Sequence, residues 1–357
     1  MKNLDFPLFK TRMGGGQKFM LEDPVERRKY FKLKVGPEIE KIKDYLNKGN
    51  TFIAFLVGKK NAGKGTYSKL FMEAVGSDKV AHLSIGDIVR SVDRDLQNEV
   101  KRAELIKYLK EKYRGFITVE EVIERLKSRS TKNLLPTEAI LSLVEREIDR
   151  LGRKAIFIDG FPRNLDQISY SLFFRALMGY RNDPDLFVFI DVPEAVIDER
   201  LKYRVVCPKC FTPRNIRVLR TKNIGYDKLT KKFYLMCDNS ACSGVRMVPK
   251  EGDDLGIEAI RERIEIDDKV MRMLLNLQGV PRIYLRNSIP IDQANEYVDD
   301  YEITPAYRYE YDEKTKEVKV IEEPWSIKDD NGVQSYSLLP APVEVALIKQ
   351  IAHVLGL

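Results

Sequence analysis

Residues 52–66 read FIAFLVGKKNAGKGT and join an apolar strand to a glycine-rich turn and a lysine. They fit the pattern GxxxxGK[ST] with one extra glycine, because Gly65 separates Lys64 from Thr66. In such a loop, backbone N–H groups can surround phosphate oxygens, the following helix points its positive end at them, and the lysine adds a mobile charge. A chance glycine-rich turn is the alternative, but the flanking strand and helix patterns favour a loop that binds a nucleoside triphosphate, with Thr66 near magnesium.

The size and composition are those of an ordinary soluble protein. The chain has 357 residues, enough for one large domain with insertions or for two domains. Hydrophobic residues make up 43% and charged residues 32%, and no apolar run approaches the roughly 20 residues that span a bilayer. The N-terminus lacks the apolar segment of a secretion signal. We therefore expect a cytoplasmic protein with no membrane partner.

Positive charge is concentrated in one part of the chain. Lysine and arginine exceed aspartate and glutamate by 61 to 54, but residues 200–232 contain eleven basic residues and one acid, Asp227. This segment alone carries a net charge of +10. The phosphates of a nucleotide or of a nucleic acid would both suit it on charge alone.

Apolar runs alternate with helical patterns after residue 51. This order predicts an α/β fold, with a P-loop at the first strand of a five-stranded, doubly wound parallel sheet that helices cover on both faces. Ligands of such sheets bind beyond the carboxyl ends of the strands, where we expect Asp87, Asp159 and Asp191. The predicted strands are 52–57, 80–84, 154–159, 186–192 and 282–285.

The two ends of the chain differ from this pattern. Residues 1–50 contain a glycine-rich stretch and a charged helix predicted over 37–46, and we interpret them as an appendage. Beyond residue 300, alternating tyrosines predict a hairpin, Asn331 with Gly332 predicts a second turn, and an amphipathic helix is predicted over 343–355.

Two further motifs contain paired charges. GDIVR, residues 86–90, places Asp87 and Arg90 on one helical face. DGFPR, residues 159–163, follows a strand, so that Asp159 can hold magnesium through water and Arg163 can reach a second phosphate. Taken one at a time, each motif could equally form a surface ion pair.

The order of these motifs resembles that of the adenylate kinase family. GKGT is followed by GDIVR, DGFPRNLDQ, DERLKYR, four cysteines, DD and RER, and the resemblance runs from about residue 51 to residue 286. It implies magnesium-dependent phosphoryl transfer between ATP and a nucleoside monophosphate (NMP). The implied division is an N-terminal extension (1–50), core (51–87), NMP-binding insertion (88–150), core (151–203), lid (204–253), core (254–287), a hairpin-rich extension or insertion (288–340) and a C-terminal helix (341–357).

The resemblance also implies roles for single residues. Asp159 resembles the ligand of the magnesium-bound water, and Asp253 with Asp254 resembles an acidic pair that positions lid arginines. The residues implied in phosphoryl transfer are Lys64, Arg163, Arg204, Arg263 and Asp159. Those implied in ATP binding are Gly58, Asn61, Ala62, Gly63, Lys64, Gly65, Thr66, Arg200 and Arg204. Those implied in NMP binding are Ile85, Gly86, Arg90, Leu135, Gly160, Arg163, Gln167 and Arg263.

All four cysteines occur within 36 residues, as CPKC and CDNSAC. Two such pairs suit a tetrahedral structural zinc, although the spacing of the second pair is looser than that of the first. Disulfides are the alternative, which the expected cytoplasmic location disfavours. Some bacterial adenylate kinases have a similar four-cysteine lid, so the resemblance implies zinc that stiffens the lid and takes no part in the chemistry. The implied ligands are Cys207, Cys210, Cys237 and Cys242.

Some positions depart from the family pattern. Lys60 and Asn61 replace the usual proline and glycine, and Ile85 replaces a threonine or alanine that commonly contacts the monophosphate base. Isoleucine cannot hydrogen-bond to a base, but Gln167 matches the adenine-reading glutamine. AMP is therefore the first expected substrate, and CMP or UMP the second.

A lid arginine expected just before Asp253 is absent, and Lys250 or Arg246 is the candidate to replace it. Two other classes of function stay open. A P-loop protein with a nucleic-acid-binding zinc ribbon could stack bases on aromatic lid residues such as Tyr226 and Phe233, and an inactive scaffold would explain the altered loop. We favour a monomeric enzyme whose partners are ATP and AMP.

Overall fold

The computed structural model describes residues 4, 6–14, 16–128, 135–162 and 183–357 of the chain. Its centre is a five-stranded sheet in the order β10-β4-β1-β3-β2, in which every pairing is parallel. The predicted α/β fold with a five-stranded parallel sheet is confirmed. The strands are β1 (Ile53–Gly58), β2 (Val80–Ser84), β3 (Ala155–Asp159), β4 (Asp185–Asp191) and β10 (Arg282–Arg286).

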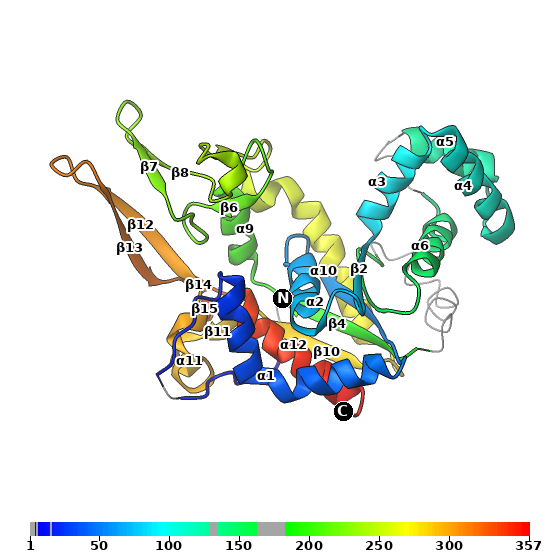
Figure 1. Ribbon diagram of the computed structural model, residues 1–357, viewed down its shortest axis with the longest axis horizontal. Helices are drawn as coiled ribbons and strands as arrows, with labels where there is room; N and C mark the ends of the chain where they lie inside the picture. The colour runs from blue at the N-terminus through cyan, green and yellow to red at the C-terminus, as the bar shows by residue number, and fades with distance from the viewer. Residues whose placement is uncertain (1–3, 5, 15, 129–134, 163–182) are drawn as a thin grey trace.

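Both faces of the sheet are buried, which explains why its strands are continuous apolar runs. Along β1, Ala54 and Leu56 belong to one core cluster and Phe55 and Val57 to the other. One face carries α2 and α12, and α1 packs across both helices, whereas α10 packs on the other face (Figure 1). These helices are α1 (Pro24–Asn47), α2 (Lys64–Val75), α10 (Arg261–Leu275) and α12 (Pro340–Val354).

Helix α1 is longer than predicted and belongs to the core. Asp23 accepts hydrogen bonds from the N–H groups of Val25 and Glu26, so the helix begins at Pro24 and not near residue 37. It kinks at Val35, where φ is −146°. Buried aromatic side chains of its first half lie in the same cluster as β1 and α12. This helix therefore packs against the core, and the division that makes residues 1–50 an N-terminal extension stays a prediction.

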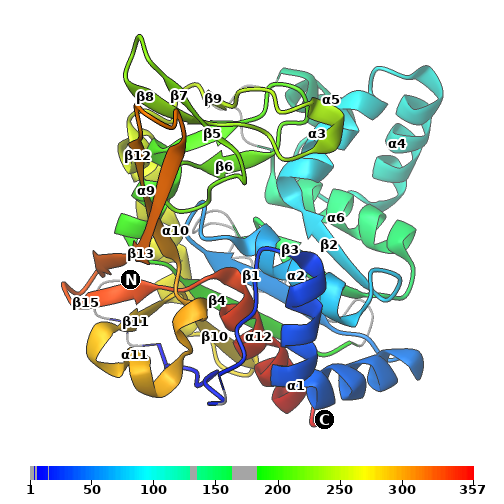
Figure 2. The same ribbon diagram turned by 60° about the vertical axis from the view of Figure 1, so that its left-hand side comes forward.

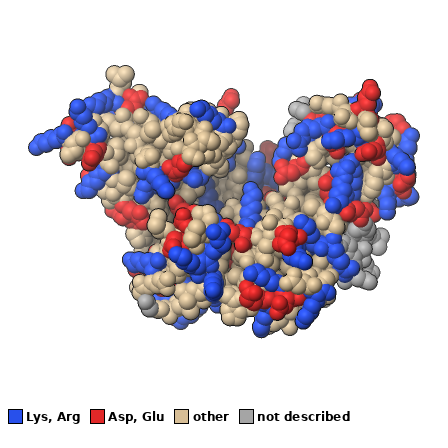
Figure 3. Space-filling model, viewed as in Figure 1, with Lys and Arg blue, Asp and Glu red and all other residues tan. Residues whose placement is uncertain are grey.

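Two parts of the molecule rise from the carboxyl edge of the sheet. One is helical, and the other contains α9 and the short strands that follow it (Figures 1 and 2). Figure 3 shows that the surface between them is hollowed. The helical part comprises α3 (Ile85–Asp95), α4 (Glu99–Lys112), α5 (Val119–Ser128) and α6 (Thr137–Leu151). The other part comprises α9 (Glu194–Lys202), β5 (Arg204–Val206), β6 (Pro213–Asn215), β7 (Ile224–Asp227), β8 (Lys232–Leu235), η1 (Ser240–Cys242), β9 (Val248–Pro249) and η2 (Gly256–Ile260).

The segment between β10 and α12 forms small sheets of its own. The predicted tyrosine-rich hairpin is present, with Tyr309 opposite Val320, and a turn at Gly332 (φ 81°) joins the last two strands. None of the helices in the described ranges is long and apolar enough to cross a membrane. The elements of this segment are β11 (Ser288–Pro290), α11 (Ile291–Tyr297), η3 (Asp300–Glu302), β12 (Pro305–Tyr311), β13 (Val318–Pro324), β14 (Ser326–Lys328) and β15 (Gln334–Ser337).

Candidate active site

The glycine-rich loop runs from the end of β1 to the start of α2. A Cβ on Gly58 would lie 3.0 Å from the carbonyl oxygen of Ile190, so the close approach of β1 to β4 requires glycine here. Asn61 and Gly63 adopt φ values of 66° and 88°. Asparagine tolerates this left-handed conformation better than most residues, so Asn61 can stand where the resemblance expects glycine.

Lys64 lies at the carboxyl ends of two adjacent strands. Its Nζ donates to the carbonyl oxygens of Gly58 (2.9 Å) and Lys59 (3.1 Å) and lies 3.8 Å from Oδ1 of Asp159. Only 14% of the Lys64 side chain is exposed. The structure thus brings the predicted P-loop lysine and the predicted magnesium aspartate into one site.

Asp267 on α10 joins the loop to a predicted arginine. Its carboxylate accepts the N–H of Lys60 (2.8 Å) and forms an ion pair with Arg263 (2.8 Å). Burial raises the pKa of Asp267, against the opposing effects of Arg263, Lys64 and the Lys60 N–H. The sequence analysis missed Asp267, although its position four residues after Arg263 on a helix was a usable signal.

The predicted NMP-binding residues lie in different environments. Arg90 pairs with Asp87, and the exposed fractions of their side chains are 70% and 68%, respectively. Ile85 is 2% exposed within the core cluster below α3, and Leu135 packs against the same cluster. Gly86 follows Ile85 in α3, and Gly160 follows β3 with a φ of 87°. The predicted residues Arg163 and Gln167 lie outside the described residues.

The predicted lid arginines each have a partner near the base of the lid. Arg204 pairs with both carboxylate oxygens of Asp253, at 2.5 and 2.8 Å. Arg200 lies 3.4 Å from Oδ1 of Asn287, and burial lowers its pKa while Tyr67 opposes the shift. Asp254 is exposed. The structure therefore brings Arg204 and Asp253 together, while the implied roles of both residues stay predictions.

Arg246, one of the two candidates to replace the missing lid arginine, is engaged within the lid. Its guanidinium lies over the ring of Tyr234, 4.1 Å from the centroid, and 3.4 Å from a carboxylate oxygen of Asp227. Lys250 is exposed. A role for either residue in nucleotide binding stays a prediction.

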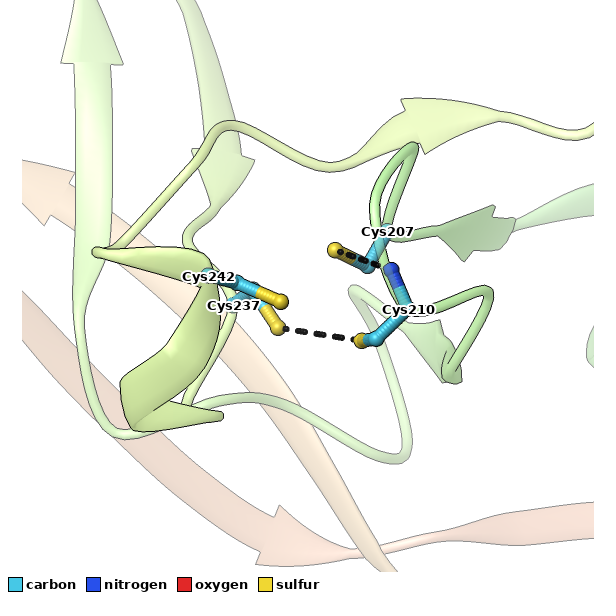
Figure 4. Close-up of side chains that lie close together, drawn as sticks. All are labelled: Cys207, Cys210, Cys237 and Cys242. Carbon is cyan, nitrogen blue, oxygen red and sulfur yellow. Dashed lines mark hydrogen bonds between the residues drawn. The ribbon is translucent and has the colours of Figure 1, made fainter.

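The four cysteines lie together, and none forms a disulfide (Figure 4). Their sulfur atoms are all within 4.8 Å of one another, and Cys210 Sγ is 3.7 Å from Cys237 Sγ. Hydrogen bonding with Thr212 lowers the pKa of Cys210 to about 6, whereas burial first, and then the other thiols, raise the pKa of Cys242 to about 12. Four soft ligands from two loops could hold a metal ion.

The tyrosine-rich hairpin lies beside residues 204–253, the predicted lid (Figures 1 and 2). The Tyr309 ring is 5.5 Å from the Phe233 ring, and its hydroxyl donates to the carbonyl oxygen of Ile216 at 2.5 Å. The N–H of Tyr307 donates to the carbonyl oxygen of Arg217 at 2.7 Å. The sequence predicted the hairpin but not this contact with the lid.

Comparison with known proteins finds relatives that align with this chain over most of the relatives' length. No protein-family model matches the chain. An adenylate kinase of Thermotoga neapolitana is 28% identical over 246 residues, which cover 68% of this chain and 93% of the relative. An adenylate kinase of Clostridium novyi is 29% identical over 225 residues (62% and 83%), and the mitochondrial GTP:AMP phosphotransferase of Drosophila melanogaster is 27% identical over 220 residues (62% and 80%). The chain is a homologue of the adenylate kinases, which are phosphotransferases.

Proposed function

We propose that the protein is an adenylate kinase that reversibly converts ATP and AMP into two molecules of ADP, with magnesium bound to ATP. An oxygen of the AMP phosphate would attack the γ-phosphorus, and the bond from that phosphorus to the bridging oxygen of ADP would break. Such transfer requires alignment and charge stabilisation more than covalent help from the protein. The observation that carries the proposal is the position of Lys64, at the carboxyl edge of the sheet and 3.8 Å from Asp159.

The residues would share this work in the following way. The loop N–H groups and Lys64 would hold the ATP phosphates, and magnesium, where present, would neutralise charge between them. Asp159 would orient a water on the metal. Arg263, ion-paired to Asp267 beside the loop, would contact the transferring group. Arg163, by its place in the DGFPR motif, would hold the monophosphate.

The remaining assignments follow the two raised parts of the molecule. We propose that residues 88–150 are the NMP-binding insertion and residues 204–253 the lid. The surface between them is hollowed (Figure 3), so closure of both parts over the nucleotides would exclude water. Arg90 is exposed on the first part and Arg204 lies at the base of the second, from where each would approach a bound nucleotide.

We also propose that the cysteine cluster binds a structural zinc ion. A tetrahedral site with Zn–S bonds of about 2.3 Å separates its sulfur atoms by about 3.8 Å. The distance of 3.7 Å between Cys210 and Cys237 fits this geometry and exceeds the about 2.05 Å of a disulfide. The ion would supply binding energy to a small segment whose core cluster is limited.

Nucleic-acid binding through the lid has less support. Base stacking would need free aromatic faces, but Tyr226 and Phe233 contact each other and the rings of Tyr311 and Tyr309. We propose AMP as the preferred monophosphate because Gln167 matches the adenine-reading glutamine, with CMP or UMP as the alternative.

A coupled assay with ATP and each of AMP, CMP, UMP and GMP tests this function. We expect ADP formation to be fastest with AMP and to fall by at least about a hundredfold in the Lys64→Ala variant, because the charge that stabilises the transferring phosphoryl group is lost. Lys69→Ala removes an exposed lysine from the same helix and is the matched control. ADP formation that survives unchanged in Lys64→Ala would contradict the proposal.

A further inference from the structure

Lys59, within the glycine-rich loop, points away from the expected triphosphate site. Only 2% of its side chain is exposed, and its Nζ lies 2.6 Å from Oδ2 of Asp330 and 3.2 Å from Oε1 of Glu194. Burial alone would lower the pKa of Lys59, but the two carboxylates outweigh burial and raise it. Lys59 is therefore a buried, charged ammonium with two acidic partners.

Asp330 reaches this lysine from a turn that is distant in the sequence. The turn joins β14 to β15, and Asp330 Oδ1 also accepts the N–H of Glu194 at 2.7 Å, at the start of α9. Its neighbour Asp329 accepts the N–H groups of Asn331 and Val333, both at 2.9 Å. The two contacts of Asp330 itself, with Lys59 Nζ and with the N–H of Glu194, place its carboxylate between the loop and α9.

The backbone of Lys59 has a second role in the loop. Its carbonyl oxygen accepts from Nζ of Lys64 (3.1 Å) and from the N–H of Ala62 (3.1 Å). Lys59 thus contacts Asp330 through its side chain and Lys64, the P-loop lysine, through its carbonyl oxygen. If Lys59 moved, its carbonyl oxygen would move as well, and the hydrogen bond from Lys64 Nζ would change.

We propose that Asp330 is a positioning residue for the triphosphate site, an inference that rests on the proposed function. By pairing with Lys59, it fixes the Lys59 carbonyl beside Lys64 and keeps a second ammonium group away from the ATP phosphates. The 288–340 segment therefore completes the phosphate-binding loop. Because AMP would bind through other residues, Asp330 affects the binding of ATP and not that of AMP.

The test compares two neighbouring acids of the same turn. Asp330→Asn keeps an oxygen that can accept the N–H of Glu194 but loses the charge that faces Lys59. We expect KM for ATP, and the Kd of magnesium-ATP measured by calorimetry, to rise on the order of five- to tenfold. KM for AMP should stay within about twofold of wild type. Asp329→Asn is the control: it keeps the Oδ1 that accepts the N–H groups of Asn331 and Val333, removes a charge from the same turn without touching Lys59, and should keep both KM values within about twofold of wild type.

Two more variants separate positioning from a general loss of structure. Asp330→Glu keeps the charge and should recover most of the ATP affinity. In a Lys59→Met background, Asp330→Asn should change the Kd of magnesium-ATP by less than about twofold, because its partner is already absent. This double-mutant comparison also decides the matter if Asp330→Asn alone folds poorly.

Three results would overturn the inference: an unchanged KM for ATP in Asp330→Asn, equal rises for ATP and AMP, or the same rise in Asp329→Asn. The failure of the proposed function is a separate result. If the wild-type protein forms no ADP from ATP and AMP, the proposed function fails, while the Kd of magnesium-ATP still shows whether Asp330 positions the loop.

Discussion

The ring of Tyr311 stacks on the ring of Tyr226, with centroids 4.2 Å apart and ring planes inclined by 18°. This pair joins the hairpin of β12 and β13 to the β7 and β8 strands of the lid. The hairpin, residues 305–324, has more acidic than basic residues, whereas the lid is strongly basic. Stacking therefore attaches the lid to the segment that also carries Asp330.

Removal of the Tyr311 ring should loosen the lid. An aromatic pair contributes about 1 kcal/mol beyond the burial of its area, so we expect Tyr311→Ala to increase the rate of proteolysis and of amide exchange in β7 and β8. Thr315→Ala, at the exposed turn of the same hairpin, serves as the control. Wild-type exchange rates in the lid of Tyr311→Ala would mean that the stack contributes nothing to lid attachment.

Asp267 should matter for turnover, and its neighbour Asp268 should not. Asp267→Asn weakens the contacts to the Lys60 N–H and to Arg263, so we expect kcat for ADP formation to fall on the order of tenfold to a hundredfold. Asp268 pairs with Arg272 at 2.7 Å, one turn along the same helix. Asp268→Asn should keep kcat within about twofold of wild type. Equal kcat values for the two variants would argue against a role for Asp267 beside the loop.

The five-stranded sheet could be predicted because each strand is a short apolar run between helical patterns, and burial on both faces requires such runs. The P-loop and its aspartate could be predicted for the same reason, since they lie directly after strands. Helix α1 was predicted too short because the predicted segment began at Pro37, which lies inside the helix. The true start, Asp23 followed by Pro24, has the capping chemistry of a helix N-terminus.

Contacts between distant segments could not be predicted. Lys59 and Asp330 are 271 positions apart, and neither residue type signals a buried pair by itself. The sequence carried no signal for the direction of the Lys59 side chain, which turns toward two acids of other elements. Likewise, the alternation of Tyr309 and Tyr311 predicted a strand but carried no information about the surface that the strand would meet.

Metal removal should destabilise the lid. We expect about one zinc ion per chain by elemental analysis, and its removal by a chelator should make the lid sensitive to protease because the folded lid then loses its metal-binding free energy. Cys242→Ser should reproduce this sensitivity, whereas Lys222→Ala, an exposed change in the same lid, should not. A metal-free protein with a protease-resistant lid would contradict the structural-metal proposal.

Asp185 should make stability depend on pH. Burial, followed by the charge of Asp183, raises the pKa of Asp185 from 3.8 to about 8. Because the pKa of Asp185 is higher in the folded state than in the unfolded state, folding favours the protonated carboxyl group. This contribution to the free energy of unfolding is complete below pH 3.8 and is lost as the pH rises through about 8. Urea unfolding should therefore show lower stability at about pH 9.5 than at about pH 6, with a smaller difference in Asp185→Asn.

The exposed variant Glu310→Gln is the control for this pH effect and should behave as the wild type does. The same loss of stability between the two pH values in Asp185→Asn and in wild type would show that other groups cause it.

The central claim is that the P-loop and the residues around it transfer a phosphoryl group between adenine nucleotides. Incubation of the purified protein with magnesium and ADP alone, followed by chromatographic separation of the nucleotides, tests it most directly. The account predicts that ATP and AMP appear in equal amounts, at a rate that is proportional to the protein and strongly reduced in Lys64→Ala. ADP that remains unconverted, or ATP that appears without matching AMP, would contradict it.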